Sequence, residues 1–412
     1  MAEQDSIAIV GAGVIGASIA YALAREGRHV TLIDRAPPGE GGASFGNAGH
    51  VATELVEPLP SPSLLFGFWR ELTAFGGVLD IPTRRLARFT PWAIRFAAAA
   101  FRRSAGTAKL APFMRPAVPA LMGLLRDAGR DDLIRQNGHY EIWLRGEVEA
   151  CARDQAAAMT ALEVPTESAR SDIVEAARRN ANADRAAGLY FPKCAHVLDP
   201  LEVVRAFVTA AQKHGAAFVR GTAREVRPTD GHVDVLCDDA TVRARSALVC
   251  AGVWSAPLMR RFGLKAPLEA ARGYHVQMPR ATPLVDAPIL YSNEKIVVTP
   301  MQGRVRATSF MEFAGAEAPP DPAKPAWLRA TVRKLGYICD DDAATWVGPR
   351  PCLPDYLPAI GRVRDAPQVF YAFGHQHIGL TLSGVTANAV ADLVAGRTPR
   401  HDIAAFDLNR FG

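Results

Sequence analysis

The 412-residue sequence lacks the features that define several classes of protein. Its longest apolar stretches, 15–24 and 96–101, fall short of the ~18 residues that a membrane-spanning helix needs. Six cysteines are scattered without a C-x-x-C pair or a metal-ligand spacing, so free thiols and no metal site are predicted. The opening residues MAEQDSIAIV lack a basic region and a cleavage site, so we expect no signal peptide and a cytosolic location.

The composition that is present is ordinary for a globular protein, apart from one basic segment. Hydrophobic residues make up 49% and charged residues 22%, which excludes disordered and coiled-coil classes. The length predicts two or three domains, or one large two-lobed enzyme. The formal net charge is +5, but segment 83–103 alone holds six arginines and no acid. This pattern argues against a nucleic-acid-binding protein and predicts one local basic surface.

The chain opens with a strand, a glycine-rich turn, a helix and a second strand. Residues 6–10 and 29–34 are short apolar strands, and residues 11–27 have a helical pattern that ends at a glycine. Further on, strands are predicted at 139–144, 217–220 and 232–237, and an amphipathic helix follows Asp199. The first unit is a βαβ unit, which is typical of nucleotide-binding proteins.

Gly11, Gly13 and Gly16 form a G-x-G-x-x-G motif between the first strand and the helix. The first glycine allows a tight turn, the second allows backbone to approach a pyrophosphate, and the third lets helix and strand pack closely. Asp34 ends the second strand, where a carboxylate binds a ribose hydroxyl. Because the flanking strands and the acid are in register, we predict a dinucleotide site.

A second loop of small residues, GGASFGNAGH at 41–50, follows soon after the acid. Such a loop suits a flat, buried cofactor that the backbone must approach closely. It favours FAD over NAD, although the glycine motif itself fits either.

Four blocks, which span residues 7 to about 396, resemble one family when they are taken together. They are the glycine motif with the acid and the following A-S-x-x-N-A-G, then A-G-x-W-S at 251–255, G-x-R-P at 348–351 with P-D and P-x-I-G after it, and G-H-x-x-x-G at 374–379. They resemble the D-amino-acid oxidase superfamily of flavoproteins. The wording of GNAGHVATE, GHQHIGLTLSGVTA and RGYH is most similar to enzymes that oxidise D-proline-type substrates, especially cis-4-hydroxy-D-proline.

The resemblance implies an α/β (α+β overall) fold with two interleaved parts. A Rossmann-like FAD-binding domain would comprise residues 1–57, 196–264 and 345–412. A β-sheet substrate domain with helical insertions would comprise residues 58–195 and 265–344.

The resemblance also implies non-covalent FAD. Asp34 stands where many members have glutamate, and it has a shorter reach to the ribose. Cys352 stands too far along the chain to match the cysteine that tethers flavin in some relatives. The residues expected to contact FAD are Gly11, Gly13, Val14, Ile15, Gly16, Asp34, Arg35, Ala43, Ser44, Asn47, Ala48, Gly49, Arg224, Gly252, Gly374, His375, Gln376, His377, Ile378, Gly379, Leu380 and Thr381.

Five residues are candidates for substrate binding. Arg350 lies in the rigid turn GPRP, and its planar guanidinium can hold a carboxylate with two parallel hydrogen bonds. The resemblance places the carboxylate-binding arginine at this position. His50, His377, Tyr274 and Glu312 are the other candidates, and each has packing or solvent exposure as its alternative role. No side chain is predicted to act as an essential acid or base, since the cofactor carries the hydride chemistry.

The arginine-rich segment 83–103 interleaves aromatic residues with its cations, which predicts an amphipathic helix interrupted at Pro91. Its aromatic residues would pack on the second part of the molecule. Alternatively, the segment would contact the inner face of the membrane and bring the flavin to a quinone, or it would bind a protein partner.

The leading functional hypothesis is an FAD-dependent D-amino-acid dehydrogenase or oxidase that forms an imine from a cyclic substrate. Its electron acceptor would be a quinone, a carrier protein or oxygen. Oxidation of an N-methyl amino acid such as sarcosine, a flavin subunit of an electron-transfer complex, and an NAD-linked dehydrogenase are the alternatives.

Overall fold

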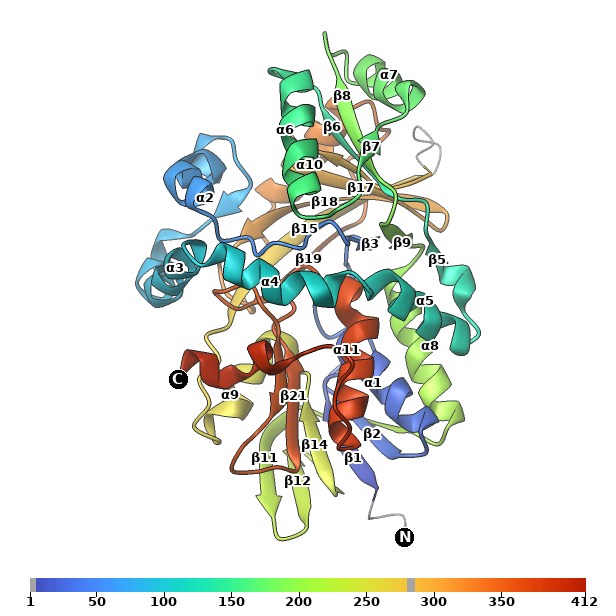
Figure 1. Ribbon diagram of the computed structural model, residues 1–412, viewed down its shortest axis with the longest axis vertical. Coiled ribbons are helices and arrows are strands. Elements are labelled where there is room, and N and C mark those ends of the chain that lie inside the picture. Colours follow the sequence, from blue (N-terminus) through green and yellow to red (C-terminus); the bar gives the residue numbers. More distant parts are fainter. Residues whose placement is uncertain (1–4, 280–285) are drawn as a thin grey trace.

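The structure is a computed structural model that describes residues 5–279 and 286–412. Residues 1–4, and with them the start of the segment searched for a signal peptide, lie outside the described residues. Residues 280–285 also lie outside the described residues. The chain forms a lower part with both termini and an upper part, and it crosses between them several times (Figure 1).

A six-stranded sheet forms the centre of the lower part, and all its strands are parallel except the last. In spatial order the strands are β10 (Ala217–Arg220), β2 (His29–Asp34), β1 (Ser6–Val10), β14 (Ser246–Val249), β21 (Val369–Phe373) and β20 (Ala359–Arg362). The predicted strands of the opening βαβ unit are confirmed with the expected bounds.

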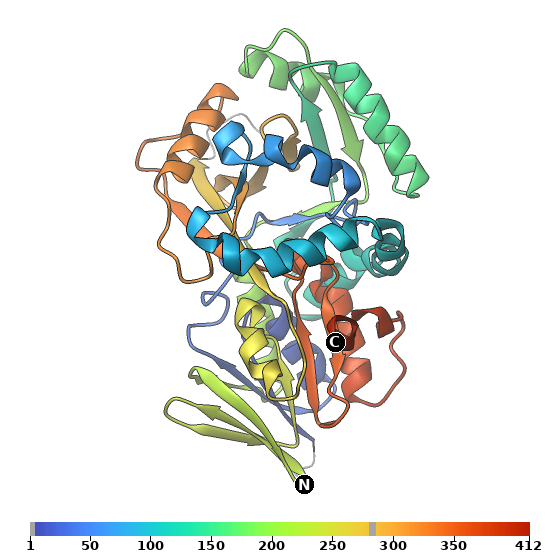
Figure 2. The same cartoon turned by 90° about the vertical axis from the view of Figure 1, so that its left-hand side faces the viewer.

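Both faces of this sheet are covered, which explains why its strands are apolar throughout. Ile7 and Ile9 of β1 point into a core that includes α1 (Val14–Arg25), α8 (Pro200–Lys213) and α11 (Gly379–Val394). The alternate residues Ala8 and Val10 point into a second core. That core includes β11 (Ala223–Thr229), β12 (His232–Cys237), β13 (Thr241–Ala244) and α9 (Ser255–Arg260). Figure 1 shows the three long helices side by side, and Figure 2 shows the antiparallel ribbon at the lower left.

A nine-stranded sheet forms the upper part. Its strands in spatial order are β19 (Thr345–Cys352), β15 (Glu269–Pro279), β18 (Arg304–Glu312), β17 (Ile296–Met301), β16 (Ile289–Tyr291), β6 (His139–Trp143), β8 (Ala187–Phe191) and β7 (Glu167–Ser168), with β4 (Leu79–Asp80) beside β18. The upper part also contains the helices α6 (Val148–Ala161), α7 (Ser171–Asn180) and α10 (Ala323–Lys334).

The sheet pairing corrects one of the expected domain boundaries. β19 was assigned to the FAD-binding domain, but it pairs along its length with β15 of the upper sheet. The upper part therefore extends to Cys352. The rest of the division into domains stays a prediction.

Two further groups of elements lie between the parts. The small sheet β3 (His50–Val51), β9 (Ala195–Val197) and β5 (Ile134–Arg135) lies at their junction. The helical insertion consists of α2 (Pro62–Gly67), α3 (Leu86–Ala100), α4 (Arg103–Met114) and α5 (Ala117–Asp127), with short 3-10 turns at Phe68–Glu71, Thr73–Phe75, Thr83–Arg85 and Asp131–Leu133. Further 3-10 turns are Gly252–Trp254, Ala404–Phe406 and Leu408–Phe411. The predicted interruption at Pro91 is wrong, because α3 continues through that residue.

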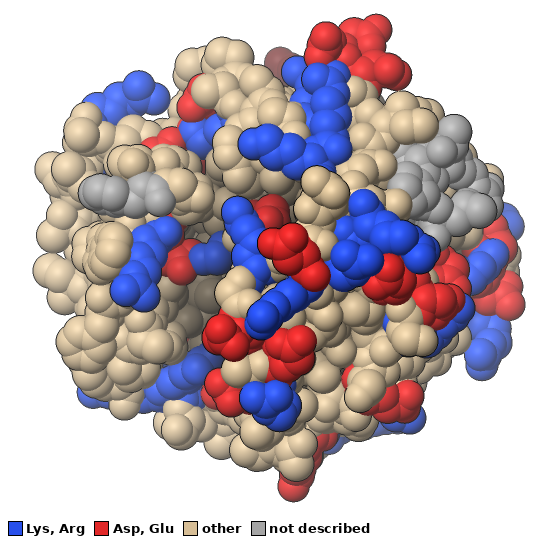
Figure 3. Space-filling view, turned by 90° about the horizontal axis from the view of Figure 1, so that it is seen from above, with Lys and Arg blue, Asp and Glu red and all other residues tan. Residues whose placement is uncertain are grey.

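Charge is distributed over the surface in both signs. On the face drawn in Figure 3, acidic and basic side chains are interspersed. Among the residues that the structure describes, no helix is long and apolar enough to cross a membrane.

Candidate active site

A cavity of about 1130 Å³ lies between the two parts of the molecule. It is larger than the roughly 300–1,000 Å³ of most small-molecule pockets, so it has room for a dinucleotide and a substrate. Its lower wall is the glycine-rich turn and the ends of the parallel strands, and its upper wall comes from β18, β19 and α3.

The glycine motif has the backbone geometry that close approach requires. Gly11 has a φ of 110° and lies against Cys250, so a side chain there would overlap the carbonyl of Cys250. A side chain at Gly16 would overlap the carbonyl of Gly11, so this glycine permits packing of α1 on β1 and does not line the cavity. Gly11 and Gly13 do line it, beside the N-terminus of α1, where unpaired N–H groups favour a phosphate.

Asp34 is held at the end of β2 by backbone donors. The N–H of Ala12 donates to its Oδ2 at 2.7 Å, and the N–H of Ala36 donates to its Oδ1 at 3.1 Å. A carboxylate has about four acceptor sites, so capacity remains for a ribose hydroxyl at the cavity wall.

The second small-residue loop closes over the start of α1. The N–H of Val14 donates to Oγ of Ser44 at 2.9 Å, so this loop meets the helix N-terminus directly. Ser44, Asn47 and Ala48 line the cavity, whereas Gly49 does not. Gly49 has a φ of 75° and packs against Met301 and Val197, so its contribution is the turn itself.

At the opposite end, the cavity wall includes Arg224, Gly252 and Arg35, as expected. The guanidinium of Arg35 lies 3.9 Å from the ring centre of Trp254. Arg224 pairs with Asp238 at the surface, so its backbone faces the cavity.

The C-terminal turn lines the cavity through six of its predicted residues, while two others are directed elsewhere. Ile378 is buried in the core of the lower part and is not a cavity residue. Thr381 accepts a hydrogen bond from the N–H of Ala52 at 3.0 Å, which ties α11 to the chain after β3. The cavity residues of this turn are Gly374, His375, Gln376, His377, Gly379 and Leu380.

Arg350 lies deep in the molecule and lines the cavity. Burial lowers the pKa of its guanidinium. Its Nη1 donates to the carbonyl of Phe310 at 2.7 Å, and within the described ranges it forms no ion pair with a carboxylate. A side chain at Gly273 would overlap this guanidinium, so the glycine of the RGYH segment makes its position available. A cavity-lining arginine that has no carboxylate partner among the described residues is suited to bind an anionic group.

The family model described as FAD dependent oxidoreductase (DAO) matches residues 6–393. The chain belongs to this family. It is 30% identical to the D-amino-acid oxidase of Bradyrhizobium diazoefficiens over the full length of both chains. It is 29% identical to the D-amino acid dehydrogenase of Cereibacter sphaeroides, with 98% and 95% of the two chains covered. In fold it is similar to the glycine oxidase of Geobacillus kaustophilus, with a TM-score of 0.73, 24% identity and 98% of each chain covered.

Membership of this family makes the chain an FAD-dependent enzyme, and the glycine turn, Asp34 and the small-residue loop fit FAD in the cavity. Cys352 is fully buried and is not among the cavity residues, which agrees with FAD bound without a covalent link. Its Sγ lies 3.9 Å from the hydroxyl of Tyr356.

His377 and His50, the two histidines predicted to bind substrate, both line the cavity. The side chain of His377 is open to the cavity although it lies deep in the protein, and its ring centre is 6.0 Å from that of Tyr356. Burial, with a smaller contribution from Arg350, lowers the pKa of His377 to about 4. His50 also borders the cavity, but its Nε2 lies 3.8 Å from Oε1 of Glu54. Both imidazoles are therefore neutral near pH 7.

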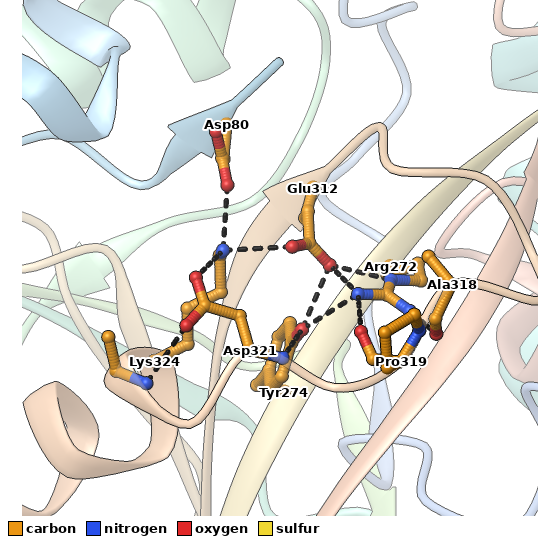
Figure 4. A network of polar contacts seen from close by, with 9 residues as sticks. Asp80, Arg272, Tyr274, Glu312, Ala318, Pro319, Asp321 and Lys324 are labelled. Atoms are coloured by element: carbon orange, nitrogen blue, oxygen red, sulfur yellow. Dashed lines mark hydrogen bonds and ion pairs between the residues drawn. The ribbon is translucent and has the colours of Figure 1, made fainter. Parts of the chain in front are cut away.

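The structure corrects the substrate-binding roles expected for Tyr274 and Glu312. Neither lines the cavity, and both are at most 3% exposed. The hydroxyl of Tyr274 donates to Oε2 of Glu312 at 2.9 Å. Glu312 also pairs with Arg272 and with Lys324, whose Nζ is 2.9 Å from its Oε1 (Figure 4). An acid alone on an apolar strand is here the centre of a buried ion-pair network.

Most of the apolar wall of the cavity consists of residues that were not predicted from the sequence to line it. Phe89, Trp92 and Phe96 of α3 form a stacked row that lines it. They pack against Phe313 and Tyr356, as expected for the aromatic residues of 83–103, whereas the expectation is wrong for Phe101, which is 69% exposed. The spacing of these aromatics was visible in the sequence, but the part of the cavity that they border was not.

Phe310 is a second missed residue. It lies in β18 with a φ of 71°, a conformation that costs a residue with a side chain about 1–3 kcal/mol. Its carbonyl accepts the hydrogen bond from Arg350. Backbone strain therefore accompanies the contact that orients the guanidinium.

Proposed function

We propose that this flavoenzyme oxidises a D-amino acid to the corresponding imine. The observation that carries the proposal is Arg350, a cation deep in the protein on the wall of the cavity that fits FAD, which pairs with no carboxylate among the described residues. The relatives named D-amino-acid oxidase and D-amino acid dehydrogenase, matched over nearly the whole chain, support the same class of substrate.

The residues divide the work of substrate binding. Arg350 holds the carboxylate with a pair of charge-assisted hydrogen bonds, which fixes the orientation of Cα. His377, neutral because of its lowered pKa, accepts a hydrogen bond from the substrate nitrogen without competing for the carboxylate. The row Phe89, Trp92 and Phe96 excludes water from the reacting carbon. FAD, when bound, accepts the hydride from Cα.

We propose a cyclic substrate, cis-4-hydroxy-D-proline or D-proline. The flat aromatic wall suits a compact ring, and the segments GNAGHVATE, GHQHIGLTLSGVTA and RGYH resemble enzymes for such substrates. An N-methyl amino acid such as sarcosine is the second candidate, since its nitrogen is also secondary.

The test is anaerobic reduction of the purified yellow protein by a panel of compounds. The panel contains D- and L-amino acids, D-proline, cis-4-hydroxy-D-proline and sarcosine. We expect the flavin absorbance to bleach fastest with D-proline-type compounds. Bleaching by sarcosine alone would replace the cyclic substrate with the second candidate. A yellow protein that dithionite reduces but no amino acid reduces would contradict amino-acid oxidation and favour an electron-transfer subunit.

We further propose that the insertion contacts an anionic membrane surface, where a quinone accepts the electrons. Six of the seven large hydrophobic side chains that the described residues expose lie between 66 and 101, namely Phe66, Phe68, Trp69, Leu86, Ile94 and Phe101. Arg84, Arg88, Arg95 and Arg102 are exposed along the same segment. Apolar side chains flanked by arginines suit a negatively charged lipid surface.

The patch also borders the active-site cavity. Leu64, Leu65 and Phe68 line it, and Phe68 is half exposed. A quinone that enters from the bilayer would therefore reach the flavin without crossing the protein.

Sedimentation with vesicles tests this surface. We expect binding to vesicles that contain phosphatidylglycerol, weaker binding in high salt, and loss of binding when Phe66, Ile94 and Phe101 are all replaced by serine. Ile338→Ser is the matched control, because Ile338 is exposed to a similar degree outside this segment. Failure of the wild-type protein to bind such vesicles even in low salt would contradict the proposal.

A further inference from the structure

Four side chains from separate segments meet beside the cavity. His50 lies in β3, Glu54 in the turn after it, His139 at the start of β6 and Cys194 immediately before β9. One ligand atom from each lies within 4.8 Å of the other three. His139 and Cys194 are buried, each 1% exposed, and the side chains of His50 and Glu54 are 9% exposed.

Hydrogen bonds among these residues leave several polar atoms without partners. The thiol of Cys194 donates to Oε2 of Glu54 at 2.9 Å. Nε2 of His50 and Nδ1 of His139 each lie 3.8 Å from Oε1 of Glu54, which is too far for a hydrogen bond. Nε2 of His50 and both ring nitrogens of His139 have no hydrogen-bond partner among the described residues. Buried polar groups usually have a partner, so these ring nitrogens are available to bind a ligand.

The spacing of the ligand atoms fits a tetrahedral metal ion. Ligands at the roughly 2.0–2.3 Å of zinc–nitrogen, zinc–oxygen and zinc–sulfur bonds lie about 3.3–3.8 Å apart at the corners of a tetrahedron. The two nitrogen-to-oxygen separations of 3.8 Å in the cluster lie at the upper end of this spacing, so a bound ion would draw these ligands slightly closer together. The ring centres of His50 and His139 are 4.5 Å apart, so the two imidazoles lie side by side in the cluster.

The donor set indicates which ion is suitable. Two neutral imidazoles, one carboxylate and one thiolate exactly balance the charge of a divalent cation, which allows the centre to be buried. A thiolate with imidazoles suits zinc, whereas magnesium and calcium prefer oxygen ligands. Four protein ligands also close the coordination shell, as in structural zinc sites.

We propose that His50, Glu54, His139 and Cys194 bind one Zn²⁺. Binding forms a bond between zinc and Sγ of Cys194, and the thiol proton leaves to the solvent. No metal site was predicted from the sequence, because consecutive ligands lie up to 85 residues apart with no motif among them.

The site ties three segments together at the junction of the two parts. His50 follows the loop 41–49 that lines the cofactor cavity, while His139 and Cys194 belong to the upper part. The zinc therefore fixes one wall of the cavity, and His50 serves this structure through Nε2. Zinc has no redox change of its own, so it does not compete with the flavin for electrons.

The test is the metal content of the untagged holoenzyme after purification without chelator and dialysis. We expect one zinc per chain by elemental analysis, with FAD quantified separately. The protein is then loaded with Co²⁺, whose ligand-field bands in a tetrahedral site extend to longer wavelengths than oxidised flavin absorbs. His139→Gln should lose the metal, and Cys194→Ser should lose the thiolate-to-cobalt band. Cys339→Ser, which changes a buried thiol outside the cluster, should keep both.

Each result decides the proposal without reference to turnover. A wild-type protein that contains no zinc and takes up neither Zn²⁺ nor Co²⁺ would overturn it. Metal retained equally in His139→Gln and Cys194→Ser would also overturn it, because the ion would then lie elsewhere. If either variant fails to fold, the zinc content and the cobalt spectrum of the wild-type protein still decide, since among the described residues this cluster is the group of possible ligands that includes a cysteine.

Discussion

The guanidinium of Arg350 occupies the space that a side chain at position 273 would fill, so its position requires glycine there. The arginine lies over the glycine, and the carbonyl of Phe310 accepts a hydrogen bond from Nη1. Arg350 also lines the cavity. The position of this cation therefore depends on a neighbouring strand as much as on its own turn.

Replacement of Arg350 tests the carboxylate contact. We expect Arg350→Ala to lower kcat/KM by about two to three orders of magnitude, because two charge-assisted hydrogen bonds are lost. The kcat/KM of Arg350→Lys should lie between those of the wild type and of Arg350→Ala. Lysine keeps the positive charge but cannot form the pair of parallel hydrogen bonds. FAD content and the flavin spectrum should be unchanged. Steady-state kinetics measure the effect, and a variant with wild-type kcat/KM would exclude the contact.

Acid should destabilise the protein through its buried histidines. Burial, with a smaller effect of Arg306, lowers the pKa of His275 to about 3 from its ordinary 6.5. Between these values the unfolded chain binds a proton that the folded chain does not, so stability is lost as pH falls below 6.5. His275→Gln should therefore reduce the slope of the unfolding free energy by about 1.4 kcal/mol per pH unit. Urea unfolding at several pH values measures it, and an unchanged slope would contradict the assignment.

Among the elements, α10 and β18 are joined by the ammonium of Lys324. Its Nζ lies 2.7 Å from Asp80, 2.9 Å from Glu312 and 2.7 Å from Asp321, and the residue is 4% exposed. Burial alone would lower the pKa of Lys324, but these three hydrogen bonds raise it overall. One charged side chain thus holds a helix, a central strand and the short strand β4.

Removal of this cation should destabilise the upper part. We expect Lys324→Met to lower the free energy of unfolding by about 3 kcal/mol, because Glu312 and Asp80 lose a buried partner. Lys334→Met, at the exposed end of the same helix, is the control and should have little effect. Chemical denaturation of both variants measures the difference. Equal stability of the two variants would show that the network contributes nothing measurable.

The bounds of helices and strands were predicted well from the sequence where a single local pattern of apolar residues specifies them. The strands at 29–34, 217–220 and 232–237 have the predicted bounds, because alternating apolar residues leave few alternatives. The interruption at Pro91 was wrong, since packing of Phe89 and Trp92 against Phe313 outweighs the single backbone hydrogen bond that proline removes. The pairing of β19 with β15 depends on contacts distant in sequence and was likewise missed.

For the whole molecule, FAD should stabilise both parts, because both contribute walls to its cavity. Removal of FAD should lower the midpoint of thermal unfolding. Free FAD at a hundredfold excess over its dissociation constant should restore about 2.7 kcal/mol. Differential scanning calorimetry over a range of FAD concentrations measures the shift. A midpoint independent of FAD, or a second transition that FAD does not move, would contradict a cavity shared by both parts.

Motifs in the sequence were enough to predict the nucleotide turn, the acid at the end of β2 and Arg350 as a candidate for substrate binding. These depend on short motifs, whose spacing already places the residues on one strand, turn or helix. Only the tertiary structure decided that Tyr274 and Glu312 face away from the cavity, that α3 supplies its aromatic wall, and that His50, Glu54, His139 and Cys194 meet. The direction of a strand's side chains and the meeting of distant segments depend on how sheets pair and pack, and no local pattern contains that information.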